Sequence, residues 1–179
     1  MINLKDLINQ YEIKQKRYYK NFKKLTKKFH HRPFLKKREV YKILYWKLYR
    51  RRRDYHLKNF NDENKPSEVI TATKLAFSSK DDESKVNYLD NLKQVGVPVA
   101  SAILTVWNPK RYGVIDDYVV KAIEKHGRKL NIGRVKLNKN KAKDYVKYLD
   151  IIRKIGSSRK PKLTAREVDM ALFMLGKKK

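Results

Sequence analysis

Few residue types in this sequence could carry out chemistry, which narrows the choice of site. The 179 residues include no cysteine, so disulfides, thiolate nucleophiles, zinc–thiolate sites and cysteine-ligated iron–sulfur clusters are excluded. The histidines His30, His31 and His56 stand in no metal-ligating pattern, and we expect them on the surface. Carboxylates remain, and Asp116 and Asp117 directly precede an apolar run that predicts a helix. Aspartate is a favoured N-cap, so capping is an alternative to a chemical role.

A second group of residues could bind a phosphate through the backbone. The segment Val95-Gly96-Val97 predicts a tight hairpin between two apolar-periodic helices, over about residues 89–104. Glycine adopts a positive φ at low cost, so Gly96 is expected to take that conformation. A bare turn followed by the free N–H groups of a helix start suits a DNA phosphate. The residues expected to contact DNA here are Gln94, Val95, Gly96, Val97, Val99, Ala100 and Ser101.

The charge of the chain also points to a polyanion. There are 46 Lys and Arg against 18 Asp and Glu, a net charge of +28. Self-repulsion of this size favours a nucleic acid as the partner, with an acidic membrane surface as the second choice and a merely solvated lysine-rich surface as the third. The run Arg50, Arg51, Arg52 and Arg53 is a candidate phosphate-contact strip or a solvated helix face. Tyrosines among the lysines, such as Tyr18 and Tyr45, are expected to pack helices, with base stacking as the alternative.

The hydrophobic periodicity predicts an all-α fold. Two long basic helices are expected over residues 3–30 and 34–60, followed by a polar linker at residues 61–66. Shorter helices are expected over about residues 66–77, 82–94, 98–107, 117–125 and 141–155, and from the capping box that begins at Thr164. We therefore divide the chain into a basic helical N-terminal extension, residues 1–60, and a second domain, residues 61–179. No apolar run could span a membrane and no secretory signal is visible, so a cytoplasmic location is expected.

The hairpin segment resembles a known family. The residues LKQVGVPVASAIL, from Leu92 to Leu104, are similar to the L-P-G-V-G-x-x-x-A pattern of the helix-hairpin-helix DNA glycosylases, the superfamily of endonuclease III and 3-methyladenine glycosylase II. In that family a catalytic aspartate follows a Gly/Pro loop and an apolar pair, which here places Asp116 after Val114-Ile115. The motif DDYVVK also resembles the aspartate region of the 3-methyladenine enzymes, which would favour Asp117. We prefer Asp116 because it follows the apolar pair directly.

The resemblance covers about residues 66–126 well and residues 140–176 fairly, and it extends to uncharacterised prokaryotic proteins of the superfamily. It implies a helix-hairpin-helix glycosylase-like domain that acts in base-excision repair by hydrolysing the N-glycosidic bond of a damaged base. The aspartate would stabilise the cationic sugar, after the base has left the DNA stack. The candidates for stacking on that base are Tyr88, Trp107, Tyr112 and Tyr118.

The departures from the family pattern shape the expected chemistry. Bifunctional members carry a Schiff-base lysine where this sequence has Pro98, so a glycosylase without lyase activity is expected. The family's hairpin often holds a monovalent cation on its backbone carbonyls, here those around Gln94 and Val97. No other cofactor and no metal site made of side chains is expected.

Two other functions compete with the glycosylase. The first is a non-enzymatic, sequence-nonspecific DNA-binding protein that uses the same hairpin. The second is binding of RNA or a membrane surface by the basic N-terminal helices. For the two DNA-binding functions we expect double-stranded DNA as the partner, a monomer, and association with the nucleoid if the protein is prokaryotic.

Overall fold

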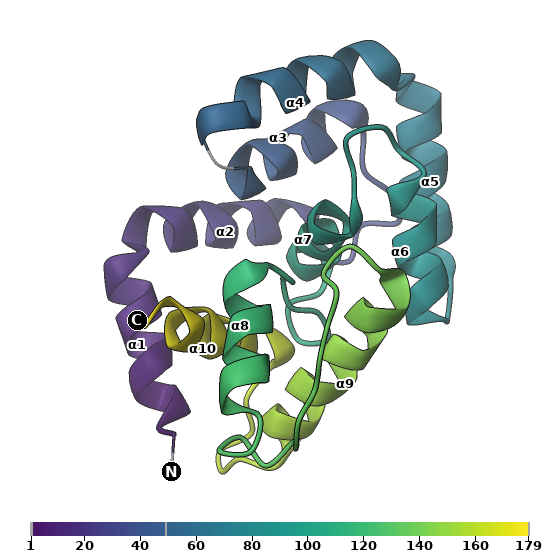
Figure 1. Ribbon diagram of the computed structural model, residues 1–179. Helices are drawn as coiled ribbons and strands as arrows, with labels where there is room; N and C mark the ends of the chain where they lie inside the picture. Colours follow the sequence, from purple (N-terminus) through teal and green to yellow (C-terminus); the bar gives the residue numbers. More distant parts are fainter. Residues whose placement is uncertain (1, 49, 179) are drawn as a thin grey trace.

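The described part of the chain contains ten α-helices and no strand (Figure 1). The computed structural model describes residues 2–48 and 50–178, except for the side chains of residues 50 and 51. The predicted all-α class is therefore confirmed. In chain order the helices are α1 (Leu4–Lys14), α2 (Lys16–Phe29), α3 (Lys37–Lys47), α4 (Arg50–Glu63), α5 (Pro66–Ser78), α6 (Asp82–Asp90), α7 (Val97–Trp107), α8 (Asp117–His126), α9 (Ala142–Ser157) and α10 (Ala165–Lys177).

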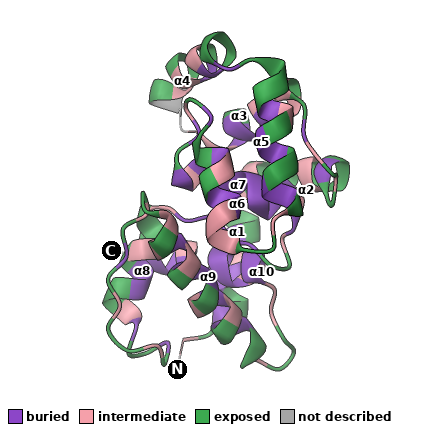
Figure 2. Cartoon of the chain, turned by 90° about the vertical axis from the view of Figure 1, so that its right-hand side faces the viewer, coloured by how far each residue is buried: buried purple, intermediate pink, exposed green. Residues whose placement is uncertain are grey.

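The helices form two groups, which meet where α9 contacts α6 and α7 and where α1 contacts α2. Helices α1, α8 and α9 pack around α10, whereas α2, α3 and α6 pack against α7 and are joined by α4 and α5 (Figure 1). Helix α7 is apolar on almost every side, and the residues from Val99 to Val106 are all buried. A helix that is apolar all round belongs in a core, which is where Figure 2 places α7.

The first sixty residues are part of the common core. Leu4 and Tyr11 of α1 are buried against α10, and Phe22 and Phe29 of α2 are buried in the same hydrophobic cluster as the residues of α7. The boundary that we predicted after residue 60 runs through α4, which ends at Glu63 inside the expected linker. The two predicted segments therefore share one hydrophobic core.

We predicted two long N-terminal helices, but the structure divides each of them into two shorter ones. The first breaks at Gln15, whose backbone (φ −111°, ψ 28°) ends α1 and begins α2. The second ends at Leu48, which has extended backbone (φ −78°, ψ 138°), and α4 follows. Both breaks have the same physical cause, since the apolar stripes on either side of them pack against different partners. Helix α1 packs on α10, while α2 turns away to pack on α7 (Figure 1).

The hairpin lies where the sequence predicted it, but its backbone differs. Helix α6 ends at Asp90, and a six-residue turn leads to Val97, the first residue of α7. The left-handed residue of this turn is Gln94, with φ +66°. Gly96 has φ −72° and ψ 171° and serves as the N-cap of α7, so the expected positive φ at Gly96 is wrong. In the family's L-P-G-V-G pattern, Gln94 occupies the position of the first glycine.

The N-terminal helices hold this turn in place. The buried Asn64 accepts a hydrogen bond from the Lys93 backbone N–H at 2.9 Å and donates to the Lys93 carbonyl at 3.1 Å. The Gln94 side chain in turn lies 2.7 Å from Nδ1 of His56, on α4. The hairpin is thus fixed to the end of α4 through both its backbone and its left-handed residue.

Replacing Asn64 with alanine should therefore loosen the hairpin. The variant removes two part-buried hydrogen bonds to the Lys93 backbone, and because each such bond contributes about 0.5–1.5 kcal/mol, the two together contribute about 1–3 kcal/mol. We expect Asn64→Ala to lower the free energy of unfolding by that amount in urea titrations. Asn87→Ala on the exposed face of α6 is the matched control, and an equal loss in both variants would contradict the anchoring role.

Candidate nucleic-acid site

Asp116 combines a capping role with an accessible carboxylate. Its Oδ1 accepts hydrogen bonds from the backbone N–H groups of Tyr118 at 2.9 Å and Val119 at 3.1 Å, so Asp116 is the N-cap of α8. Its Oδ2 lies 3.9 Å from Nζ of Lys47, and 23% of its side chain is exposed. One carboxylate oxygen is therefore engaged by the helix start, while the other faces a lysine from a distant part of the chain.

Buried side chains from α9 and α10 fix the loop that leads to Asp116. The Val114 N–H donates to Oδ2 of Asp169 at 3.0 Å, and the Tyr148 hydroxyl donates to the Val114 carbonyl at 3.3 Å. The Tyr145 hydroxyl donates to the Gly113 carbonyl at 3.1 Å. An isolated loop would leave these polar groups to water, whereas here they are satisfied inside the core. The position of Asp116 is thus set by the packing of both helices.

A glycine is required at the start of this loop. A Cβ atom on Gly113 would lie 2.7 Å from Cδ1 of Ile152 and 2.9 Å from Cβ of Asp169. The loop therefore passes so close to α9 and α10 that a larger residue would push it outward. The glycine in the Gly/Pro loop of the sequence pattern is thus explained by close packing against α9 and α10.

The hairpin is joined to the same loop by Ser101. Its buried hydroxyl accepts a hydrogen bond from the Ile115 N–H at 3.1 Å and donates to the Pro98 carbonyl at 2.8 Å. Ile115 directly precedes Asp116, so one side chain of α7 couples the helix that follows the hairpin to the carboxylate. The Ser101 hydroxyl is therefore engaged inside the protein, and the predicted contact of Ser101 with DNA stays a prediction.

A buried ion pair lies beneath the loop. The Arg166 guanidinium donates to Oδ2 of Asp169 and, at 2.8 Å, to the Tyr11 hydroxyl. It also lies over the ring of Phe22 at 4.7 Å and near that of Trp46 at 6.0 Å. Burial raises the pKa of Tyr11 to about 12, so its hydroxyl stays protonated at neutral pH. This cluster ties α1, α2 and α3 to α10 directly under the loop that carries Asp116.

Lys47 is the least expected member of the site. It is the last residue of α3, and only 13% of its side chain is exposed. Burial lowers the pKa of the Lys47 ammonium, and the nearby Asp116 carboxylate opposes that effect. Among the described residues, no ion pair besides the one with Asp116 involves Lys47.

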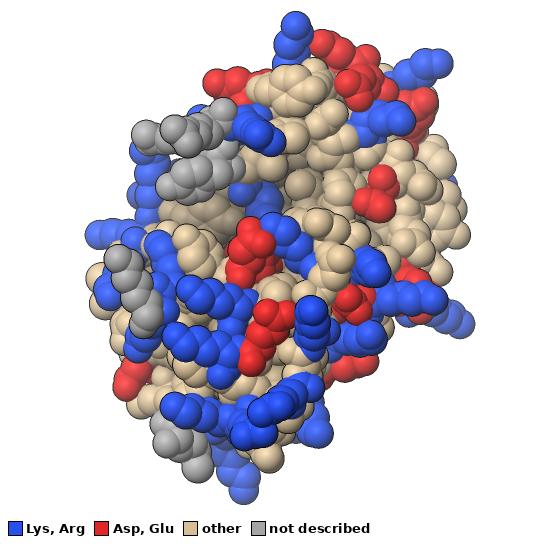
Figure 3. Space-filling model, viewed as in Figure 1, with Lys and Arg blue, Asp and Glu red and all other residues tan. Residues whose placement is uncertain are grey.

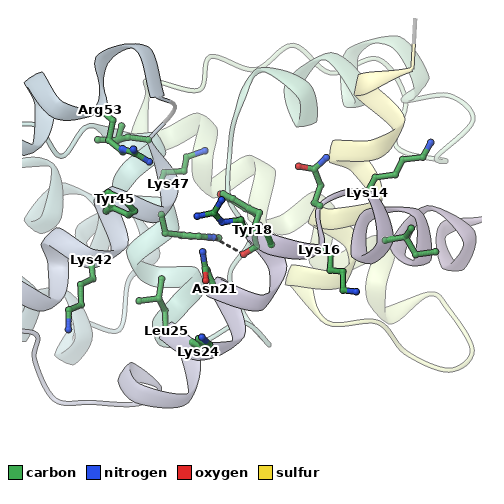
Figure 4. Close-up of a pocket in the computed structure, with 15 residues that line it drawn as sticks. Lys14, Lys16, Tyr18, Asn21, Lys24, Leu25, Lys42, Tyr45, Lys47 and Arg53 are labelled. Atoms are coloured by element: carbon green, nitrogen blue, oxygen red, sulfur yellow. Dashed lines mark hydrogen bonds between the residues drawn. The ribbon is translucent and has the colours of Figure 1, made fainter.

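Lys47 also lines a cleft in the described part of the molecule. The cleft has a volume of about 780 Å³ and lies between the α1–α2 junction, α3 and α4 (Figure 4). No carboxylate occurs among its described lining residues. Its basic residues are Lys14, Lys16, Arg17, Lys24, Lys42, Lys47 and Arg53. The cleft therefore presents a concentrated positive charge, and Asp116, which is not one of its lining residues, contacts it through Lys47.

Aromatic rings form part of the same lining. Tyr18 stacks on Trp46 with ring centroids 4.6 Å apart, and the Trp46 indole N–H donates to the Tyr18 carbonyl at 3.1 Å. Tyr45 is half-exposed, with the Arg53 guanidinium 4.0 Å from its ring centroid. Flat rings beside cations suit a nucleotide, whose base stacks and whose phosphate is anionic. These tyrosines are expected from the sequence mainly to pack helices, and the alternative of base stacking fits the half-exposed Tyr45 better.

Two of the four predicted stacking residues make packing contacts inside the protein. The Tyr112 ring is buried, with 1% of the residue exposed, and its hydroxyl donates to Asp82 at 2.8 Å. Trp107 stacks on Phe77 at 4.6 Å with nearly parallel rings. Tyr112 is enclosed, whereas Trp107 is partly exposed beside its stacked partner, and the stacking of either ring on an extruded base stays a prediction.

The other two candidates stay predictions. Tyr88 is half-buried and lines a separate groove beside the hairpin, together with residues of α4 and α5. Tyr118 is 41% exposed, follows Asp116 by two residues, and packs edge-on against Phe173. Only Tyr118 is therefore close in the chain to the candidate carboxylate.

The remaining predicted residues fall into different environments. The Asp117 side chain is 80% exposed and forms an ion pair with Lys139 at 2.6 Å. Of the arginine run, Arg52 is exposed and Arg53 lines the cleft, while the side chains of Arg50 and Arg51 lie outside the described residues.

Most of the hairpin side chains are unavailable to a ligand. The side chains of Val95, Val97, Val99 and Ala100 are buried, so these residues could reach DNA only through their backbone. Gly96 is exposed and Gln94 is half-buried. The groups of the hairpin that remain accessible for the predicted DNA contact are therefore those of the turn and the first backbone N–H groups of α7.

The comparisons with known proteins add no further assignment. Among the described residues there is no group of three or more His, Cys, Asp or Glu side chains placed to hold a metal ion. Within the same residues no helix has the length and apolar character needed to cross a membrane. The chain matches no family model, and the searches of curated proteins and of solved structures give no match.

Proposed function

We propose that this protein binds DNA and hydrolyses the N-glycosidic bond of a damaged base, with Asp116 as the catalytic carboxylate. The observation that carries the proposal is the contact of Asp116 with Lys47 at the wall of a basic, aromatic-lined cleft. Base removal passes through a cationic sugar, and a fixed carboxylate stabilises that charge or orients the attacking water. The required parts are a carboxylate, a space for a nucleotide and a positive surface for its phosphates.

The arrangement of the hairpin supports the same function. A backbone turn at the start of α7 offers N–H groups to a phosphate, and Ser101 links this helix to the residue before Asp116. A DNA strand held at the hairpin would therefore be held in a fixed relation to the carboxylate. The net charge of +28 supplies the long-range attraction that such binding needs.

The experiment that tests the proposal is a base-release assay. Duplexes that carry uracil, hypoxanthine, alkylated purines or 8-oxoguanine are incubated with the purified protein and then treated with alkali, which breaks the strand at abasic sites. We expect alkali-dependent breaks with at least one of these lesions. If none of the duplexes loses its base, the glycosylase proposal is rejected.

The charge of Lys47 should set the alkaline limit of the reaction. Because burial lowers the pKa of this ammonium, it loses its proton at a lower pH than an exposed lysine would. An arginine keeps its charge at all accessible pH values. We therefore expect the rate of base release by the wild-type protein to fall on the alkaline side, and Lys47→Arg to extend the plateau to higher pH. Lys42→Arg, which changes another lysine of the cleft, should leave the profile as it is.

A non-enzymatic DNA-binding protein is the second candidate. It is favoured by the ion pair itself, since Lys47 and the N-terminus of α8 together satisfy both oxygens of Asp116 without a substrate. Under this alternative, duplex DNA is retarded in a gel at low salt, affinity falls steeply with salt, and no lesion is processed.

A further inference from the structure

Helix α2 carries an unusual concentration of unopposed positive charge. Seven of its side chains are exposed Lys or Arg, and it contains no acidic residue. None of the seven forms an ion pair with a described carboxylate. They are Lys16, Arg17, Lys20, Lys23, Lys24, Lys27 and Lys28. Such a surface repels itself unless an anion covers it.

These residues form two adjoining rows. Lys16, Lys20, Lys23 and Lys27 follow one another at intervals of three or four residues, which places them along one line of the helix. We call this line the lysine row. Arg17 and Lys24 lie on the neighbouring face and line the cleft together with Lys16. The lysine row therefore begins at the edge of the cleft and continues away from it.

The opposite face of α2 is not free. Phe22 and Phe29 are buried, and Leu25 is packed against the core on the same side. A basic amphipathic helix binds a membrane by burying its apolar face between the lipids. In α2 that face is already occupied by α7 and α3, so only the charged face is left for a partner. A partner with a regular array of negative charges fits this face better than a lipid surface does.

The dimensions of the lysine row suit a nucleic-acid strand. From Lys16 to Lys27 the helix rises about 17 Å at 1.5 Å per residue. One strand of B-DNA carries a phosphate for about every 3.4 Å of its axis, so about five phosphates lie within that length. Lys and Arg side chains also border the recess between α2 and α4 in Figure 3. The charge of the row is thus continuous with the charge of the cleft.

We propose that the lysine row of α2 is a track for the phosphates of one DNA strand and guides that strand to the cleft. The inference rests on the proposed DNA-binding function and adds a second contact surface to the hairpin. Helix α2 packs directly on α7, so the track and the hairpin belong to one rigid unit. A strand could then be held on both sides of the nucleotide that enters the cleft.

The test compares two triple variants with the same loss of charge. Lys20, Lys23 and Lys27 of the row, none of which lines the cleft, are changed to glutamine in the first variant. Exposed lysines of other elements, Lys74, Lys80 and Lys154, are changed to glutamine in the second. Affinity for a lesion-free duplex is measured by fluorescence anisotropy at several salt concentrations. Circular dichroism and thermal melts establish that both variants are folded.

The slope of log affinity against log salt gives the result. Each phosphate contact that is lost reduces the steepness of this slope by about 0.9, so we expect a change of about 2.7 for the row variant. The second variant should change the slope by less than about 1. Equal changes in the two variants would overturn the track, because net charge alone would then explain binding. Loss of binding to phosphatidylserine vesicles with an unchanged DNA slope would overturn it in favour of a membrane surface.

The proposed phosphate track and the proposed glycosylase activity can be rejected independently of each other. Base release by the row variant is measured at low salt and saturating protein, where binding is not limiting. A normal rate together with slopes that match the second variant rejects the track and keeps the enzyme. A selective change of slope in a protein that releases no base rejects the enzyme and keeps the track.

Discussion

Asp116→Asn is expected to reduce base release by at least about 100-fold and to leave duplex binding unchanged or tighter. The amide cannot balance the positive charge that develops on the sugar, whereas the loss of a negative charge lowers the repulsion of phosphates. Asparagine is as good an N-cap as aspartate, so its side-chain oxygen can still accept the N–H groups of Tyr118 and Val119. The measurement is single-turnover base release on whichever duplex the wild-type protein processes, with binding followed by gel shift.

Asp117→Asn is the matched control for this experiment. Asp117 is largely exposed, and its ion pair with Lys139 is of the kind that contributes at most about 1 kcal/mol. We expect wild-type base release from this variant. If Asp117→Asn is inactive while Asp116→Asn is active, the functional carboxylate has been assigned to the wrong neighbour.

The monofunctional reaction can be examined on the same samples. If the resemblance to the glycosylases holds, Pro98 stands where the bifunctional members have their Schiff-base lysine, so strand breaks should need alkali. The absence of a lysine at position 98 excludes an imine only at the hairpin. The structure brings a second amine, that of Lys47 on α3, close to Asp116. Borohydride trapping of the wild-type protein on an abasic duplex should give no covalent complex. A trapped complex that disappears in Lys47→Arg would correct the assignment and make Lys47 an imine-forming residue.

Local patterns in the sequence predicted local structure well. The all-α class, the hairpin between α6 and α7, and Asp116 at the start of α8 follow from periodicity, turn residues and capping preference, which act over a few residues. The wrong conformation at Gly96 shows the limit of this reasoning. Glycine permits a positive φ but does not require it, and the fold places Gln94 in that conformation instead.

The composition of the site could not be predicted in the same way. Lys47 and Asp116 are distant in the chain, and their contact depends on where the fold places the end of α3 relative to the start of α8. The helix breaks at Gln15 and Leu48 contribute to that placement. In the sequence, however, a continuous amphipathic stripe extends across each break. Residues 1–60 therefore looked like a separate basic extension, although they provide the lining of the cleft. A lysine in a basic helix carries no local signal that distinguishes it from its neighbours.

Asp169→Asn is expected to lower the free energy of unfolding by about 3–5 kcal/mol, because it leaves the buried Arg166 without its counter-charge. Both side chains are almost fully buried, so water cannot replace the lost carboxylate. The change is measured by urea unfolding followed by circular dichroism. The double variant Arg166→Met with Asp169→Leu removes both charges and should recover part of the loss. No recovery would mean that losing the hydrogen bond from the Val114 N–H, which only the double variant removes, costs as much as the removal of the unpaired charge regains.

The same substitution also tests how the carboxylate is positioned. Val114 lies two residues before Asp116, and its N–H donates to Asp169. An asparagine at position 169 can still accept this hydrogen bond. Its neutral amide, however, attracts the Arg166 guanidinium less strongly than the carboxylate does. In the double variant the acceptor is absent, so base release should fall further even below the unfolding temperature. If the double variant is stable and fully active, then Tyr145, Tyr148 and Ser101 are sufficient to hold the loop, and the ion pair serves the core alone.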